Sequence, residues 1–211
     1  MTRVIGRNGK KSIMNVEKLE KIRMKLKDSS VGIAGAGGLG SNAAIALARA
    51  GIGRLVIVDF DKVEESNLNR QYFFHDQIGQ TKVEALKENI HRINESIKVE
   101  TITQKLIKGE MDRPFHDVDV IIEALDSAEI KTTFIEEILL KLPDKPIVGA
   151  SGVAGYGHSD RIKTKKIGNL YICYDEDAKD CDEDVLMAPR VCLMANWQAN
   201  LTLEILLGED K

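Results

Sequence analysis

The chain alternates between short apolar runs and longer amphipathic stretches. The short runs, expected to be strands, cover residues 31–34, 54–58, 97–102, 118–123 and 147–150. The longer stretches carry apolar residues three and four positions apart and are expected to be helices over residues 16–27, 39–50, 81–94 and 128–142. Strands that are apolar throughout belong to parallel sheets covered on both faces. The pattern therefore predicts a Rossmann-like α/β fold, a mostly parallel sheet with helices on both faces.

The pattern changes after Ser151. Glycines interrupt the chain, and residues 159–165 and 169–174 then predict a strand pair at the sheet edge, a short antiparallel extension near the C-terminus. A last amphipathic helix is expected to begin near Pro189. The sequence shows no internal repeat and no low-complexity linker. We therefore expect one domain over residues 1–211, with a core at about 28–150 and a C-terminal part at about 151–211.

The composition narrows the protein class. The 211 residues include 30 Lys and Arg against 33 Asp and Glu, a net charge of −3, and 43% are hydrophobic. The three cysteines, Cys173, Cys181 and Cys192, form no C-x-x-C pair, which argues against a disulfide framework and a four-thiolate zinc site. No segment has the ~20 apolar residues of a membrane span, and no signal peptide is evident. We expect a cytoplasmic protein without zinc and without membrane contact.

Residues 175–184 are strongly acidic. They hold seven acids and one lysine. Such a segment repels nucleic-acid phosphate, so no nucleic-acid partner is expected. The segment is either a solvated loop or a flap that faces a substrate.

A glycine-rich turn follows the first predicted strand. Gly35-Ala-Gly37-Gly38-Leu-Gly40 fits G-x-G-x-x-G and opens a predicted helix. Glycines have no side chain, so a phosphate can approach their backbone closely, and a helix N-terminus offers free N–H groups to that phosphate. Asp59 ends the next predicted strand, where it can accept hydrogen bonds from a ribose. This pattern predicts a nucleotide site, although a glycine turn that only packs helix on sheet has the same sequence.

Polar and cationic residues follow Asp59 within a short distance. They are Asn67, Arg70, Gln71 and Lys82. A nicotinamide dehydrogenase does not require them, but an anionic nucleophile that attacks a phosphate is repelled by roughly 4 kcal/mol per charge pair at 4 Å and an effective dielectric of 20. Cations beside the phosphate cradle offset that repulsion.

A carboxylate is expected at the same edge of the sheet. Asp126 ends a predicted strand, where doubly wound folds bind ligands, and a hard oxygen ligand suits magnesium. The alternative is that Asp126 caps the helix that follows.

These motifs resemble a known family. The runs G-A-G-G-L-G, D-F-D-x-V, S-N-L-N-R-Q, G-Q-T-K and A-L-D-S are similar to the ThiF, MoeB and HesA branch of the ubiquitin-activating-enzyme superfamily, over about residues 26–208. The similarity is greatest to short, second-type ThiF proteins of thiamine biosynthesis. It implies a homodimeric adenylyltransferase that uses ATP and magnesium on the C-terminal Gly-Gly carboxylate of a ThiS-like sulfur carrier, with residues 151–211 facing the carrier.

The resemblance also implies roles for individual residues. Glycines 35, 37, 38 and 40 would cradle ATP and Asp59 would hold the ribose. The phosphates would be contacted by Asn67, Arg70 and Lys82, with support from Gln71. Asp126 would hold magnesium. Arg70, Lys82 and Asp126 would be the catalytic groups.

Two roles known in the family stay open in this sequence. The N-terminal arginine that family members contribute across the dimer has no clear counterpart, with Arg3 and Arg7 as candidates. Cys181 stands eight residues before Pro189, the spacing of a thiol that links to the carrier in several relatives. Its acidic neighbours disfavour the thiolate, so an incidental loop cysteine is the alternative.

Other functions stay open from the sequence alone. The carboxylate could belong to a molybdopterin carrier, a tRNA base or a peptide. A nicotinamide oxidoreductase could use the same glycine loop, and a non-catalytic ATP-binding scaffold would keep the nucleotide site without turnover.

Overall fold

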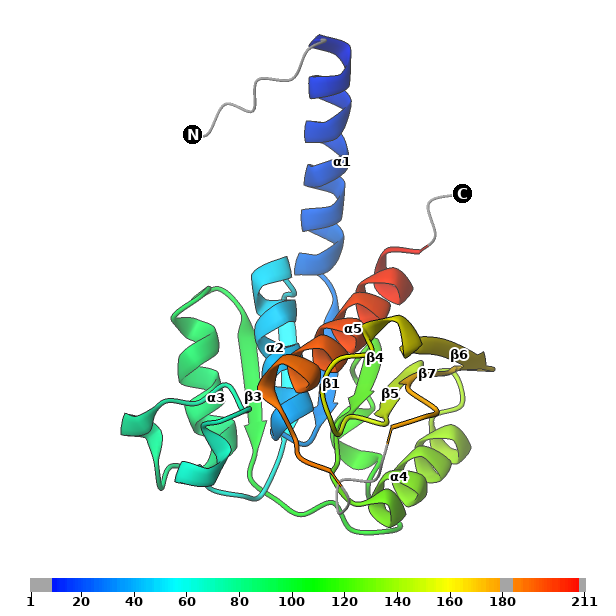
Figure 1. Ribbon diagram of the computed structural model, residues 1–211. Coiled ribbons are helices and arrows are strands. Elements are labelled where there is room, and N and C mark those ends of the chain that lie inside the picture. Colours follow the sequence, from blue (N-terminus) through cyan, green and yellow to red (C-terminus); the bar gives the residue numbers. More distant parts are fainter. Residues whose placement is uncertain (1–8, 179–183, 209–211) are drawn as a thin grey trace.

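The computed structural model describes residues 9–178 and 184–208, with side chains from residue 16 onward. Seven strands form one sheet in the order β3-β2-β1-β4-β5-β7-β6 (Figure 1). Neighbouring strands are parallel except β6 and β7, which are antiparallel. The strands are β1 (Ser30–Ala34), β2 (Arg54–Val58), β3 (Lys98–Ile102), β4 (Val120–Glu123), β5 (Ile147–Ser151), β6 (Lys163–Ile167) and β7 (Leu170–Tyr174).

Helices cover both faces of the sheet. The helices are α1 (Gly9–Lys27), α2 (Gly38–Ala50), α3 (Lys82–His91), α4 (Ala128–Lys141) and α5 (Ala188–Leu207). One core joins α2, α3 and α5 to one face, and a second core joins α4 to the other. Along β2, Leu55 and Ile57 enter the first core while Val56 and Val58 enter the second. This alternation explains why the strand is apolar at every position.

The predicted Rossmann-like fold is confirmed, with local differences at element ends. α1 begins at Gly9, earlier than the expected start at residue 16. Residues 159–161 form a 3₁₀ turn, and β6 begins at Lys163 instead of 159. His158 has a left-handed backbone (φ 48°) and stands next to Gly157 (φ 72°), so the chain turns there before it can extend. The strand pair does lie at the sheet edge, because β6 is the last strand.

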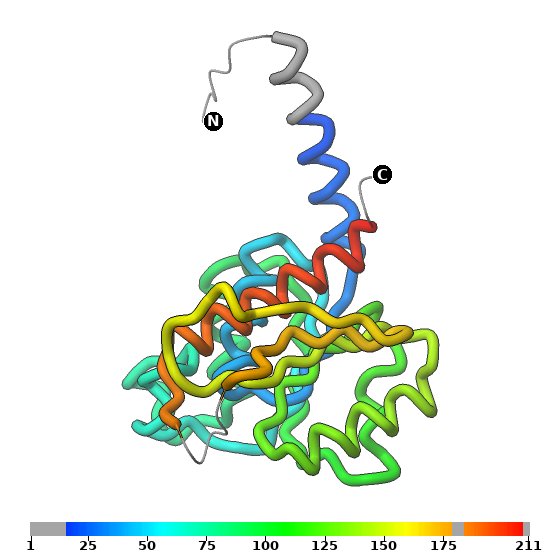
Figure 2. Tube along the Cα trace, turned by 45° about the vertical axis from the view of Figure 1, so that its right-hand side comes forward, coloured from blue at the N-terminus to red at the C-terminus, as the bar shows by residue number. Residues whose placement is uncertain are grey.

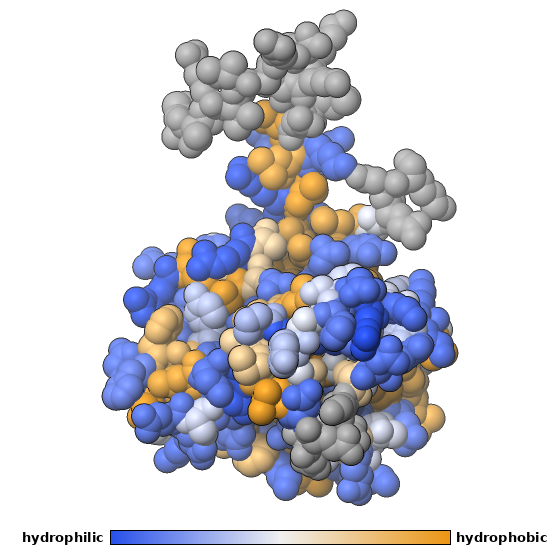
Figure 3. Space-filling view, viewed as in Figure 1, coloured by the Kyte–Doolittle hydropathy of each residue, from blue (hydrophilic) through white to orange (hydrophobic). Residues whose placement is uncertain are grey.

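α1 extends away from the body of the molecule in both views (Figures 1 and 2). Its last turn is anchored by Leu26, which is buried. Farther along the helix, Val16, Leu19 and Met24 are 52%, 46% and 68% exposed. Figure 3 shows apolar side chains along the described part of this helix. None of the helices within residues 9–178 and 184–208 is long and apolar enough to cross a membrane.

Candidate active site

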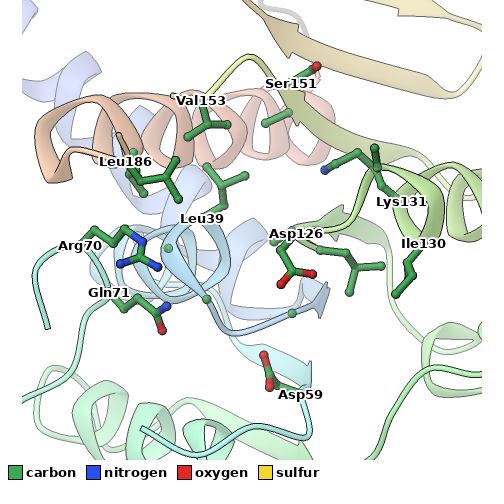
Figure 4. Close-up of a pocket in the computed structure, with 18 of the residues that line it drawn as sticks. Leu39, Asp59, Arg70, Gln71, Asp126, Ile130, Lys131, Ser151, Val153 and Leu186 are labelled. Carbon is green, nitrogen blue, oxygen red and sulfur yellow. The ribbon is translucent and has the colours of Figure 1, made fainter. Parts of the chain in front are cut away.

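A cavity of about 660 Å³ opens where the carboxyl ends of β1, β2, β4 and β5 meet (Figure 4). The strand order reverses direction beside β1, since β2 and β4 flank it. Loops diverge at such a switch point and leave a crevice for ligands. The glycine-rich turn lines one side of the cavity, and Ser151 and Val153 from the segment that ends β5 line another (Figure 4).

The glycine-rich turn is held by close backbone contacts. A Cβ on Gly40 would lie 1.8 Å from the carbonyl oxygen of Gly35, and Gly35 itself has a φ of 98°. Any side chain at Gly40 would therefore separate the helix from the turn. Gly37 is the N-cap of α2 and lines the cavity together with Gly35 and Gly38. The free N–H groups of the first turn of α2 thus adjoin the cavity.

Asp59 ties the end of β2 to this turn. One carboxylate oxygen accepts the N–H of Ala36 at 2.6 Å, and the other accepts the N–H of Asp61 at 2.8 Å. The side chain lines the cavity. Asp59 therefore orders the glycine turn and remains beside the space where a ribose would lie.

The first turn of α2 also positions the loop that carries Arg70 and Gln71. The hydroxyl of Ser41 accepts the N–H of Tyr72 at 3.0 Å. The amide of Asn42 donates to the carbonyl oxygens of Gly38 at 2.7 Å and of Arg70 at 2.9 Å. These bonds fix the loop against the glycine turn, and Ser41 and Asn42 are positioning residues that sequence reasoning missed.

Arg70 and Gln71 both line the cavity (Figure 4). The guanidinium of Arg70 donates to the carbonyl oxygen of Ser66 at 3.0 Å and to the side chain of Asn69 at 2.7 Å. The Oε1 atom of Gln71 is buried and has no hydrogen-bond partner among the described residues. A buried acceptor without a donor is costly, so a ligand that donates to Gln71 would satisfy it.

Lys82 and Asn67 occupy different positions. Lys82 lines the cavity with only 6% exposure, and its ammonium pairs with Asp61 at 2.8 Å. Asn67 is not among the lining residues. Its side-chain oxygen accepts the N–H of Glu64 at 3.0 Å, which caps the short turn before Arg70. In this structure Asn67 shapes the loop that presents Arg70.

Asp126 is exposed in the loop that follows β4 and points into the cavity (Figure 4). The alternative that it caps α4 is not what the structure shows. Ser127 is the N-cap, and its hydroxyl accepts the N–H of Ile130 at 3.5 Å. Among the residues that the structure describes, the donor to Asp126 is the adjacent N–H of Ser127, at 2.8 Å. Its carboxylate is therefore available to a ligand.

A magnesium ion fits this arrangement only together with a phosphate. The described residues contain no group of three or more His, Cys, Asp or Glu side chains that could hold a metal ion. Magnesium bound with nucleotides commonly uses one or two carboxylates, phosphate oxygens and waters. One available carboxylate beside a phosphate cradle matches that donor set.

A buried ion pair forms the wall opposite Arg70, and sequence reasoning missed it. Glu123, at the end of β4, is fully buried, and Lys131 on α4 pairs with it at 2.6 Å. Burial raises the pKa of Glu123 above its ordinary value even though Lys131 opposes that shift. Lys131 lines the cavity. The only signal in the sequence was the position of Lys131, five residues after Asp126 and in the first turn of a predicted helix.

A second buried ion pair holds the segment that follows β5. Arg190 pairs with Asp175 and donates to the carbonyl oxygen of Gly157 at 3.1 Å. Burial alone would raise the pKa of Asp175, but the Asp177 N–H and Arg190 hold it below its ordinary value. Asp175 opens the acidic stretch, and residues 179–183 with Cys181 lie outside the described residues, as do Arg3 and Arg7.

The other two cysteines lie in the fold. Cys173 is fully buried, and burial raises the pKa of its thiol to about 12. Cys192 is half-buried, with its sulfur 3.4 Å from the side-chain oxygen of Asn42. Burial raises the pKa of Cys192 as well. Both thiols are therefore poor nucleophiles at neutral pH.

The chain is similar to proteins of known family. The model of the ThiF family matches residues 10–211. The chain is 32% identical over 194 residues to the adenylyltransferase and sulfurtransferase UBA4 of Kluyveromyces lactis, with 88% of this chain and 43% of that protein covered. It is 31% identical over 195 residues to the adenylyltransferase and sulfurtransferase MOCS3 of Aedes aegypti, with 89% and 44% covered. The chain thus spans less than half the length of these relatives.

Solved structures share the fold. The E. coli tRNA N6-threonylcarbamoyladenosine dehydratase TcdA in complex with ATP superposes with a TM-score of 0.82 at 20% identity, covering 97% of each chain. E. coli MccB with ATP superposes with a TM-score of 0.69 at 21% identity, covering 94% of this chain and 64% of MccB. At these identities the likeness shows the fold alone.

Proposed function

The chain belongs to the ThiF family, and from that membership we propose that it is an ATP-dependent adenylyltransferase. Its substrate is the C-terminal Gly-Gly carboxylate of a ThiS-like, ubiquitin-like sulfur carrier, in the thiazole branch of thiamine biosynthesis. One observation carries the proposal: the glycine turn, Arg70, Lys82 and Asp126 all line one cavity. A nicotinamide oxidoreductase would leave the two cations and the available carboxylate without a role.

ATP would lie along the glycine-rich side of the cavity. Gly35, Gly37, Gly38 and the N-terminus of α2 would contact the phosphates, while Gly40 allows the turn to close on the helix. Asp59 would bind the ribose. TcdA and MccB, which share this fold, have both been solved with ATP, which supports the proposed nucleotide.

Arg70 and Lys82 would offset the negative charge that develops during the reaction. A terminal carboxylate oxygen attacks the α-phosphorus, a new O–P bond forms, and the bond between the α-phosphorus and the bridging oxygen breaks. Pyrophosphate leaves with that oxygen and its electron pair, and the carrier is left as an acyl-adenylate. Catalysis of this kind rests on positioning and charge stabilisation. The unsatisfied oxygen of Gln71 would accept a hydrogen bond from a ligand donor or from a water that bridges to the phosphates. Asn67 would act indirectly, through the loop that it caps.

Asp126 would hold magnesium together with phosphate oxygens. A bound magnesium ion supplies charge neutralisation on the phosphates. The carboxylate is at the correct edge of the sheet and has no competing role in capping α4.

The carrier would approach from the C-terminal part of the chain. We propose a nucleotide-binding core at about residues 28–150 and a carrier-facing part at about 151–211 within one adenylation domain. Ser151, Gly152 and Val153 line the cavity at the end of β5. A tail that ends in two glycines has no side chains at its end, so it can enter such a cavity.

Trapping of the product tests the proposed substrate. The protein, ATP and magnesium would be incubated separately with a ThiS-type carrier, bulk tRNA and a carboxyl-terminal peptide, and each substrate analysed for an added AMP by mass spectrometry. The proposal expects the adenylate on the carrier alone. An adenylate found only on tRNA or on the peptide would move the substrate to one of those classes, and ATP binding without any adenylate would favour a scaffold.

We further propose that the chain works as a homodimer. The exposed apolar side chains of Val16, Leu19 and Met24 lie along α1, which projects from the body of the molecule. Exposed apolar stripes of this kind mark protein contacts. A second copy of the same chain would bury them in a symmetric interface.

A further inference from the structure

The reaction brings two anions into one cavity, but the cations assigned so far lie beside the phosphate cradle. Arg70 is at one end of the cavity in Figure 4, and Lys131 is at the other, with Asp126 and the glycine turn between them. Two unit charges of like sign repel by roughly 4 kcal/mol at 4 Å and an effective dielectric of 20. The carboxylate substrate therefore also needs a cation, on the side away from the triphosphate.

The structure assigns that task to Lys131: we propose that its ammonium group binds the substrate carboxylate and directs one oxygen toward the α-phosphorus. This inference rests on the proposed adenylation. It adds a substrate-binding residue that neither the glycine motif nor the segment after Asp59 contains.

The ammonium of Lys131 has capacity for a ligand. Its side chain is 21% exposed, and it extends from α4 toward the cavity, between Ser151 and Asp126 (Figure 4). An ammonium has three N–H donors. Across the described part of the chain, Glu123 is the acceptor that the structure provides for it, at 2.6 Å. The remaining donors can reach a carboxylate in the cavity.

Glu123 fixes the position of Lys131 relative to Asp126. One oxygen of its carboxylate binds Lys131, and the other accepts the N–H of Leu125 at 2.8 Å. Leu125 directly precedes Asp126. The buried carboxylate thereby connects the cation on α4 to the loop that presents Asp126, so both groups are held in one arrangement before a substrate binds.

Stability alone does not account for this pair. A buried ion pair can often be replaced by apolar residues of similar volume at little or no loss of stability. Here the pair stands at the wall of a cavity, and its positive member points inward. A role in substrate binding explains why the charge is placed there.

The test compares a carboxylate tail with a neutral one. A ThiS-type carrier ending in Gly-Gly and the same carrier ending in a carboxamide would be bound to the protein in the presence of a non-hydrolysable ATP analogue. The wild-type protein should prefer the carboxylate form. In Lys131→Met the ratio of the affinities for the carboxylate and carboxamide carriers should fall by about 10- to 100-fold. This is the loss expected when one hydrogen bond to a charged group is removed. Affinity for the ATP analogue should not change.

Three further variants separate binding from folding. Lys131→Arg keeps donors and should restore most of the preference. The double variant Glu123→Gln with Lys131→Met leaves no unpaired buried charge, so it should fold and still lack the preference. Lys108→Met removes an exposed lysine outside the cavity and should behave as wild type.

The outcomes distinguish the two proposals. A folded Lys131→Met protein that still prefers the carboxylate carrier overturns the role of Lys131 and leaves adenylation intact. A wild-type protein that adenylates none of the carrier, tRNA or peptide overturns the proposed function itself.

Discussion

At the residue scale, the glycine-rich turn contains two kinds of glycine. Gly40 is required by the fold, because an added Cβ would lie 1.8 Å from the backbone oxygen of Gly35. Gly37 has room, because the nearest atom to its added Cβ is the side-chain nitrogen of Gln71, at 3.9 Å. That room faces the cavity. One motif thus combines a packing requirement with a ligand requirement.

Gly40→Ala and Gly37→Ala should therefore fail in different ways. Gly40→Ala forces helix and turn apart and should reduce the free energy of unfolding by about 1–3 kcal/mol or more, the usual cost of overpacking. Gly37→Ala should unfold like wild type but bind ATP more weakly, since its methyl group enters the phosphate cradle. Urea denaturation and ATP titration measure both properties. Equal stability of the two variants would contradict this division.

The sequence predicted the site residues that belong to motifs and missed those that act through packing. Arg70 and Lys82 were predicted because they follow Asp59 within a short stretch, and Asp126 because it was expected at the same sheet edge; the structure places all three in the lining of one cavity. Ser41 and Asn42 were missed because, in an Ala-rich helix, nothing in the sequence shows which polar side chain faces a distant loop. Lys131 was missed for a similar reason, since its partner Glu123 looks like the last residue of an ordinary strand.

At the element scale, the strands were predicted nearly to the residue, and the errors fell at element ends. Strands such as 54–58 are buried on both faces, so their apolar runs begin and end with the strand. The start of β6 was predicted too early, at 159 in place of Lys163. The left-handed backbone of His158 cannot be predicted from the hydrophobic pattern. Helix α1 begins earlier than predicted because residues 9–15 are rich in lysine and carry too few apolar residues to show a helical period.

A cross-strand ion pair gives the sheet an acid-sensitive element. Arg54 on β2 donates to Glu100 on β3 at 3.0 Å, and Lys98 lies 2.7 Å from the same carboxylate. Arg54 and Lys98 lower the pKa of Glu100 from 4.5 to about 2. A depressed carboxyl pKa stabilises the folded state above the unfolded pKa, and that contribution is lost as the pH falls from about 4.5 toward 2.

Glu100→Gln should remove this acid-sensitive contribution. At neutral pH the variant should be less stable than wild type, and the difference should disappear between pH 4.5 and about 2. The pair is partly exposed, so the effect is modest. Urea denaturation across that range measures it, with Glu95→Gln as a control at an exposed carboxylate. A difference that persists unchanged at low pH would show that Glu100 contributes through packing instead of charge.

At the scale of the whole molecule, α1 stands out because it carries exposed apolar side chains. The exposed side chains of Val16, Leu19 and Met24 lie on a helix that meets the body only near its C-terminal end. The rest of the described chain forms two continuous cores around the sheet. In the proposed homodimer, a second copy of the chain would bury these exposed side chains.

Leu19→Glu should therefore shift the protein toward monomer. A charge in an apolar interface loses its hydration without gaining a partner, which costs several kcal/mol. Sedimentation velocity at micromolar concentration would compare wild type with this variant, and Glu20→Gln provides a neighbouring exposed control. A wild-type protein that is monomeric at all concentrations tested would refute the proposed dimer.

This cavity is proposed to join a carboxylate to the α-phosphate of ATP. The most direct test is ATP–pyrophosphate exchange by the purified protein with magnesium and a ThiS-type carrier ending in Gly-Gly, beside Arg70→Ala and Asp126→Ala. We predict exchange that requires the carrier and falls by about 10²–10³-fold in each variant, the usual loss when one charge-stabilising group is removed. Exchange that is absent while ATP still binds, or that survives in both variants, would contradict the proposed adenylation.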